Sequence, residues 1–465
     1  MTGSAAYGDT RTDLRRDAVT HPVLLTGGMV VSMDAHRRII GQTDVLLKDG
    51  FIVAVETIDG RDLPAGTEVV DVRGRALLPG FIDCHSHSWL NVLRGVADDR
   101  GPSSLYDLLY PLDTALTSSE LVGALSGAGL LESMLGGTTT IVENGSYMGD
   151  VAEVGAALGL RISVSQNVTS VRLGDVSSDG RWMFDQRHSD ASLQRALELV
   201  RALERHPSGR ATALLAVHAT DTCSRASLEA VAELADELDL PVGIHLAQTV
   251  EEVDQIRRRE ACTPVELLAE TGLLGRRLMA AHCLHLSADD IDLLGSSGSH
   301  VVHNPVINAK RGKVAPIQAL KRAGCNIALG TDNFGNSLGE SIRQMIFVQR
   351  ILEESGTSPL PMEALEAATV GGARALGRDD QLGSIEVGKR ADLLVFNLEG
   401  PRLQPMTNVV ANIVYNATPS DIERVYIDGA LVAVDGAPTL VNERELLEAT
   451  QQANEWVWRE TYGRG

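Results

Sequence analysis

Eight short apolar segments alternate with helical stretches between Gly80 and about Leu382, and this alternation limits the fold more than any other feature of the chain. In chain order the segments are LLPGFIDCHSH, TTTIVEN, GLRISVSQNV, TALLAVHAT, PVGIHLAQ, RLMAAHCLHL, HVVHNP and CNIALGTDN. Amphipathic runs such as ASLQRALELVRALER separate them. A doubly wound sheet is the competing fold, but no Gly-rich phosphate loop follows the first segment. Eight such units predict an α/β fold of the TIM type, a parallel (β/α)8 barrel with its chemistry at the carboxyl ends of the strands.

A different sequence pattern, typical of short β-strands, flanks the barrel region on both sides. Short β-branched runs with Gly and Asp turn signals occur before it and return after it, in ADLLVFNLE, IVYNA and IERVYIDGALVAVDG. KDG and IDG, one in each part, are Asp-Gly hairpin signals. We therefore expect residues 21–78 and 384–445 to form one small β-sandwich domain built from both ends of the chain, beside a barrel over residues 79–383. Residues 1–20 are expected to form an N-terminal arm, and residues 446–465 an amphipathic C-terminal helix.

The charge balance argues against a polyanionic partner. The chain has 41 Lys and Arg against 62 Asp and Glu, a formal net charge of −21, which repels nucleic acid. No run of about 18 apolar residues suggests a membrane span, and the first residues lack the apolar core of a signal peptide. The five cysteines are scattered and form no CxxC pair, which argues against disulfides and a structural zinc site. We expect a cytoplasmic protein that acts on a small molecule.

Two histidines close together end the first barrel segment. His85 and His87 project from the same face of a strand, so both imidazoles can bind one cation, although two hydrogen-bonded core histidines would have the same spacing. Three further strand ends carry His245, His282 and Asp332. Imidazole nitrogen and carboxylate oxygen are the donors that zinc and its neighbours favour. Together these residues predict a catalytic site for a divalent metal ion.

The order HxH, His, His, Asp on strands one, five, six and eight resembles the amidohydrolase superfamily, in the branch that contains triazine hydrolases, guanine deaminase and S-adenosylhomocysteine deaminase. Stretches such as GGTTTIVEN, VVHNPVINAK and ALGTDN carry the likeness, which covers nearly the whole chain. It implies that His85, His87, His245 and Asp332 bind one metal ion, and that Asp332 also takes a proton from the attacking water. His282 is then expected to polarise the substrate carbonyl.

The resemblance also implies properties of the whole enzyme. Cobalt or zinc is the expected ion, and iron and manganese accept the same donors. Because relatives are commonly dimers or tetramers, a homo-oligomer is expected.

For Asp332 the alternative to metal binding is capping of the helix that follows, since Asp is a favoured N-cap residue.

Several other residues are candidates for substrate contact. His218 matches a strand-four histidine that contacts substrate in relatives, and a hydrogen-bonded core histidine is nearly as good an explanation. Asn304 either binds substrate or fixes the loop that follows it. Trp89 and Asn91, just after the HSH motif, are either pocket walls or packing residues.

One position departs from the deaminase pattern of this branch. Those enzymes carry a proton-shuttling Glu three residues after the strand-five histidine, and this chain has Gln248 there. An amide does not exchange protons at neutral pH. Either another group, such as His282 or Glu143, supplies the proton, or the leaving group needs none. Thiolate and chloride are such leaving groups, because even the thiol of cysteine ionises near pKa 8.5.

The loop after strand seven differs as well. Relatives that bind purines or triazines tend to read HNPxSNLKLGSG, whereas this chain reads HNPVINAKRGKV. With Gln248 and the HSHSWLN opening, this loop resembles the molinate and phenylurea hydrolases. We therefore expect a thiocarbamate hydrolase that releases a thiol. The alternatives are phenylurea or carbamate hydrolysis, triazine dechlorination, purine-type deamination and, favoured only by Gln248, a binding barrel without catalysis.

Overall fold

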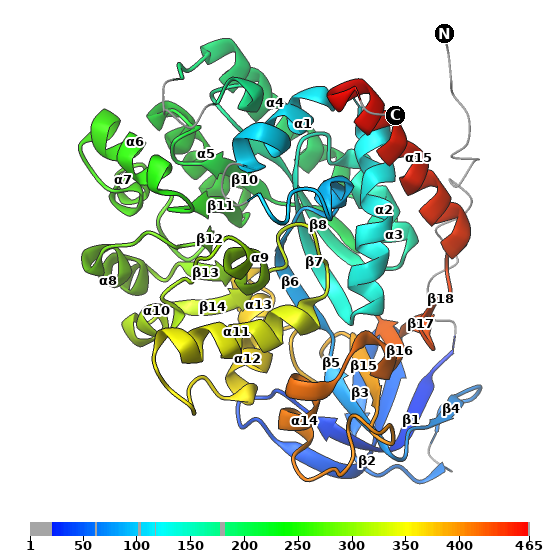
Figure 1. The fold of residues 1–465 in the computed structure, drawn as a ribbon. Coiled ribbons are helices and arrows are strands. Elements are labelled where there is room, and N and C mark those ends of the chain that lie inside the picture. Colours follow the sequence, from blue (N-terminus) through cyan, green and yellow to red (C-terminus); the bar gives the residue numbers. More distant parts are fainter. Residues whose placement is uncertain (1–20, 61–62, 101–103, 117, 177–181, 464–465) are drawn as a thin grey trace.

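A computed structural model describes the chain except for residues 1–20, 61–62, 101–103, 117, 177–181 and 464–465 (Figure 1). The expected N-terminal arm lies outside the described residues. Within them, no helix is both long and apolar enough to cross a membrane.

Eight parallel strands form a barrel, in sequence order around the ring. They are β6 (Phe81–Ser86), β7 (Thr138–Gly145), β8 (Arg161–Val168), β10 (Leu215–Ala219), β11 (Val242–Leu246), β12 (Leu278–His282), β13 (His300–His303) and β14 (Asn326–Leu329), with the short β9 (Ala211–Ala213) paired to β8. The ring closes where Ser86 pairs with Asp332, just beyond β14. Each of the eight predicted segments contains one of these strands, so the predicted barrel is confirmed.

Helices surround the barrel strands (Figure 1). Many begin at a side chain that caps the first free backbone N–H groups, as Ser224 does for Ser227 and Thr249 for Glu252. The helices between β6 and β10 are α1 (Tyr110–Ala115), α2 (Ser119–Leu135), α3 (Gly149–Ala157) and α4 (Gln186–Leu203). Those that follow β10 are α5 (Arg225–Leu238), α6 (Val250–Glu260), α7 (Pro264–Glu270), α8 (Ala288–Ser297), α9 (Pro305–Lys310), α10 (Ile317–Ala323), α11 (Leu338–Leu352), α12 (Pro361–Ala367) and α13 (Val370–Ala375).

A second sheet joins the two ends of the chain, as predicted. From the N-terminal part come β1 (Val23–Val31), β2 (Ile39–Lys48), β3 (Phe51–Val55), β4 (Glu68–Asp71) and β5 (Arg75–Pro79). From the C-terminal part come β15 (Leu393–Asn397), β16 (Ile422–Ile427), β17 (Ala430–Val434) and β18 (Ala437–Pro438). The two parts meet where β5 pairs antiparallel with β15. Both Asp-Gly signals form hairpin turns, and Asp49 and Asp428 have positive φ values of 52° and 48°.

One segment of this region was predicted wrongly. The run IVYNA, read as a strand, lies mostly in helix α14 (Val409–Asn416). The side chain of Asn408 caps this helix by accepting a hydrogen bond from the N–H of Ala411. Its buried residues repeat with helical spacing, and this tertiary packing overrides the β-branched composition. They are Val409, Val410, Ile413 and Val414.

Two sets of contacts tie the outer parts to the barrel. Arg161, the first residue of β8, is buried and donates to Asp392 and Asp428 of the second sheet at 3.2 and 2.7 Å. The C-terminal helix α15 (Glu443–Tyr462) lies along α2 (Figure 1). On this helix, Nε1 of Trp458 donates to the backbone oxygen of Val92 at 3.0 Å.

Candidate active site

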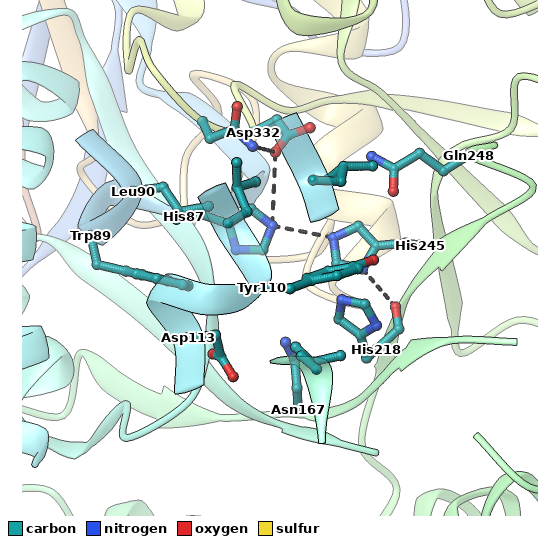
Figure 2. Close-up of a pocket in the computed structure, with 14 residues that line it drawn as sticks. His87, Trp89, Leu90, Tyr110, Asp113, Asn167, His218, His245, Gln248 and Asp332 are labelled. Carbon is teal, nitrogen blue, oxygen red and sulfur yellow. Dashed lines mark hydrogen bonds and ion pairs between the residues drawn. The ribbon is translucent and has the colours of Figure 1, made fainter. Parts of the chain in front are cut away.

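Three strand ends bring the predicted ligands together at one end of the barrel. His87 and His245 approach each other to 3.2 Å between their Nε2 atoms, and Asp332 Oδ1 lies 3.8 Å from His87 Nε2 (Figure 2). His85, His87 and Asp332 form one group of possible metal ligands, with ligand atoms within 4.8 Å of one another. A second such group joins His85, His245 and His282. All of these side chains are buried.

The backbone around the cluster is held in unusual conformations. His282 and Asp332 have positive φ values of 73° and 63°, a region that non-glycine residues seldom adopt and that is common at functional sites. Gly330 permits a close approach of β14 to β6. A Cβ atom there would lie 2.3 Å from Oδ1 of Asn304 and 2.8 Å from the backbone oxygen of His85. The cluster therefore depends on Gly330, which lies two residues before the ligand Asp332 in the ALGTDN stretch.

Backbone carbonyl groups orient two of the imidazoles. His87 Nδ1 donates to the oxygen of Asn144 at 2.7 Å, and His245 Nδ1 donates to the oxygen of His218 at 2.6 Å. Because a neutral imidazole carries one proton, the Nε2 atoms that face each other are both free to donate an electron pair. Burial lowers the pKa of both side chains, so both are neutral at pH 7.

The remaining ligand atoms also fit a metal ion. Nε2 of His85 and Oδ2 of Asp332 are buried and have no hydrogen-bond partner within the described part of the chain. Buried polar atoms are normally paired, so atoms left free inside such a cluster indicate a missing ligand. Three imidazole nitrogens and a carboxylate suit a divalent ion.

His282 lies beside the four ligands in a fixed tautomer. Its Nδ1 donates to Oδ1 of Asn308 at 3.1 Å, which leaves Nε2 as an acceptor 3.4 Å from Oδ2 of Asp332. Burial lowers the pKa of His282 to about 4, against the opposing effect of the Asp332 charge. With Nε2 as an acceptor, His282 presents no N–H toward the ligand cluster, and its role in polarising a substrate carbonyl stays a prediction.

Gln248 and Glu143, the two side chains considered in the proton argument, occupy different places. Gln248 lines the pocket, and its Nε2 donates to Nε2 of His282 at 3.1 Å. Glu143 is fully buried and accepts a hydrogen bond from the N–H of Ser88 at 3.0 Å, and it is not among the residues that line the pocket. Glu143 thus does not contact the pocket directly, and its suggested role as a proton source stays a prediction.

A pocket opens directly onto the cluster (Figure 2). It has an empty volume of about 490 Å³, which includes space open to solvent. It is lined by His87, Trp89, Leu90, Leu105, Leu109, Tyr110, Asp113, Asn167, Leu173, His218, His245, Gln248, Asp332 and Asn333. Asn91 and Asn304 are not in this lining, and Asn91 instead donates to Asn336 at 2.7 Å. Substrate contact by these two residues stays a prediction.

The tautomer of His218 follows from its neighbours. The hydroxyl of Thr222 donates to the backbone oxygen of Ala219 at 3.2 Å, so it accepts from Nδ1 of His218, 2.9 Å away. Nε2 of His218 is thus an acceptor, and the side chain lies at the pocket. Burial lowers the pKa of His218 to about 3, which keeps it neutral.

Three further lining residues had no signal in the sequence. Tyr110 lies over His218 with 5.8 Å between ring centroids, and burial raises the pKa of Asp113 to about 6. Both belong to α1, which comes from the long connection after β6, and Asn167 lies at the end of β8. Figure 2 shows Asp113 near Trp89, away from Gln248.

Comparisons with known proteins agree with this architecture. A model of the amidohydrolase family matches residues 76–432. A 5-methylthioadenosine/S-adenosylhomocysteine deaminase of Desulforudis audaxviator is 33% identical over 83% of this chain and 87% of its own length. A 5'-deoxyadenosine deaminase of Methanothermobacter thermautotrophicus is 31% identical over 93% of this chain and 97% of its own.

Solved structures show the same fold. An adenosine deaminase of Xanthomonas campestris with bound zinc has a TM-score of 0.85 at 30% identity and covers 94% of this chain and 98% of its own. A zinc complex of atrazine chlorohydrolase from Arthrobacter aurescens has a TM-score of 0.84 at 22% identity, covering 93% and 100%, and shares the fold. These relatives give no support to the narrower resemblance to molinate and phenylurea hydrolases. The extent of the family match and the convergence of the ligand cluster agree, and the chain belongs to the amidohydrolase family.

Proposed function

We propose that this chain is a metal-dependent aminohydrolase that removes the amino group from the purine ring of an adenosine-type substrate. One observation carries the proposal: a cluster of three histidines and Asp332 opens into a pocket, in a chain that is at least 30% identical to several adenosine-type deaminases. Trp89 and Tyr110 give the pocket aromatic surfaces suited to a flat heterocycle. Zinc, present in the solved relatives, is the ion we propose.

In this proposal, Asp332 makes both proton transfers, because Gln248 stands where related deaminases have an acid. When bound, the ion lowers the pKa of a water molecule and polarises the carbon that is attacked. Asp332 is placed to take the proton of that water, and neutral His282 accepts a hydrogen bond from Gln248 rather than donating a proton. Because Gln248 has no proton to give, Asp332 must also return its proton to the departing nitrogen.

The test is ammonia release by the zinc-loaded protein from adenosine, 5'-methylthioadenosine and S-adenosylhomocysteine. We expect deamination of at least one of them, and loss of activity after treatment with a chelator and recovery with zinc or cobalt. If zinc-loaded protein with full metal content releases no ammonia from any of the three, the proposal is wrong.

A second candidate rests on Gln248 alone. A site without its usual acid suits a leaving group that departs without a proton, such as the thiolate of a thiocarbamate or a chloride. The same protein is therefore assayed for thiol release from molinate and chloride release from atrazine. Faster release of thiol or chloride than of ammonia would favour this candidate over the first.

A further inference from the structure

Arg311 brings an unpaired positive charge close to the pocket. The residue as a whole is half-buried, but both terminal nitrogens of its guanidinium are shielded from solvent and have no hydrogen-bond partner among the residues that the structure describes. A guanidinium stays charged at all ordinary pH values. Burying such a group without an anion is costly, and proteins normally pair it.

The charge of Arg311 interacts with those of Asp332 and of Tyr110, which both line the pocket. Arg311 follows directly on α9, the helix after β13, and Asn308 on that helix holds Nδ1 of His282 (Figure 1).

Among the described residues, no carboxylate forms a hydrogen bond with the guanidinium of Arg311. Asp332 is the carboxylate whose charge acts on Arg311, and Asp332 belongs to the ligand cluster. A divalent ion in that cluster adds positive charge on the same side and makes an unpaired Arg311 still less favourable.

We propose that Arg311 binds a carboxylate of the substrate, so that the preferred substrate is an acidic member of its class. The guanidinium presents two parallel N–H groups that match a carboxylate, and such charge-assisted pairs are strong in a shielded site. That the substrate carries an amino group rests on the proposed function. That it also carries a carboxylate is inferred from Arg311 alone.

The test compares two probes of equal shape, benzoate and benzamide, by calorimetric titration of the zinc-loaded protein. The measured quantity is the preference for benzoate, given by the ratio of the two dissociation constants. We expect Arg311→Leu to lower this preference by about tenfold or more. Arg311→Lys should keep part of it, because an ammonium supplies the charge without the paired N–H groups. Any direct contact of benzoate with zinc is common to all variants and cancels in the comparison.

Lys313→Leu is the matched control, since it removes an exposed positive charge two residues away. It should leave the preference unchanged within about twofold, because exposed charges are screened. Arg311→Gln serves in place of Arg311→Leu should the latter fold poorly, as judged by zinc content and thermal midpoint. An unchanged preference in the Arg311 variants, or an equal loss in Lys313→Leu, would overturn the inference. No turnover is measured, so failure of the deaminase assay leaves this test intact.

Discussion

Gln248 follows the strand that carries His245, and its side chain forms a hydrogen bond with the side chain of His282. Its amide donates to Nε2 of His282, and its own N–H donates to Oε2 of Glu252 at 2.8 Å. A carboxyl group at this position would lie against the same imidazole and face the same pocket. The native site therefore has the geometry for a general acid but an amide in its place.

The first prediction concerns Gln248→Glu. It should raise kcat/KM for deamination of the best purine substrate by about 100-fold, because general acid catalysis contributes at least this factor. Gln248→Met, of similar length and without a proton, is the control and should give no gain. A fall in deamination with Gln248→Glu at full zinc content would show that the amide itself is required and that the site is not a deaminase lacking its acid.

The residues of the site were not equally predictable from the sequence. The ligand histidines and Asp332 lie at strand ends, where the period of two and the apolar run before them fix the direction of each side chain. Tyr110, Asp113 and Arg311 lie on helices that cover the barrel mouth. Their positions depend on how those helices pack, which no local pattern records.

At the scale of elements, the closure of the barrel and the ligand cluster share the same strands. Asp332 N–H donates to the oxygen of His85, and His87 N–H donates to the oxygen of Asp332, at 2.9 and 2.8 Å. These bonds join β6 to the end of β14, and Gly330 lets the two come together. A change in the spacing of these strands therefore displaces the ligands.

Gly330→Ala is predicted to disrupt both closure and metal binding. The new Cβ would collide with Asn304 and with the backbone of His85, and the backbone cannot yield cheaply. We expect a loss of stability of about 1–3 kcal/mol and a clear drop in zinc per chain, measured by denaturation and metal analysis. Gly335→Ala is the control, because a Cβ there meets no atom within 4 Å. Full zinc content in Gly330→Ala would contradict this account of the contact between β6 and the end of β14.

The C-terminal helix supports the pocket wall from outside. Trp458 donates to the oxygen of Val92, and the hydroxyl of Tyr462 donates to the oxygen of Leu108 at 2.9 Å. Both carbonyl groups belong to the segments that provide Trp89 and Leu105 to Leu109. Helix α15 thus fixes backbone that shapes the pocket without contacting the ligand cluster.

Trp458→Phe should loosen this wall and raise KM about fivefold with little change in zinc content, since it removes one hydrogen bond worth about 1 kcal/mol. Trp456→Phe is matched to it, because Trp456 is on the same helix and is 38% exposed. Steady-state kinetics of both variants provide the measurement. Equal kinetics for the two would mean that α15 does not influence the pocket.

The helices and strands also differed in how well the sequence predicted them. Barrel strands are buried on both sides, so their composition alone identifies them. In IVYNA the same β-branched composition occurs in a helix, because the Asn408 cap and contacts with the rest of the fold decide its conformation. Local composition identifies an element only where burial and periodicity agree.

At the scale of the whole molecule, a buried ion-pair group holds the barrel to the second sheet. Arg161→Met should leave Asp392 buried without its cation and destabilise the protein by about 3–5 kcal/mol, seen as a lower denaturation midpoint. The exposed pair of Arg73 with Asp71 is the control, and Arg73→Met should leave the denaturation midpoint nearly unchanged, because solvent screens exposed ion pairs. An equal change in the denaturation midpoint of the two variants would contradict a special role for the buried ion pairs of Arg161.

The pairing of β5 with β15 has a consequence for synthesis of the chain. On the ribosome, β1 to β5 emerge first, and the edge of β5 has no partner until the entire barrel and residues 393–397 have been made. Unpaired strand edges invite association with other chains. Messages truncated before β15 should therefore yield insoluble fragments, even where the barrel sequence is complete.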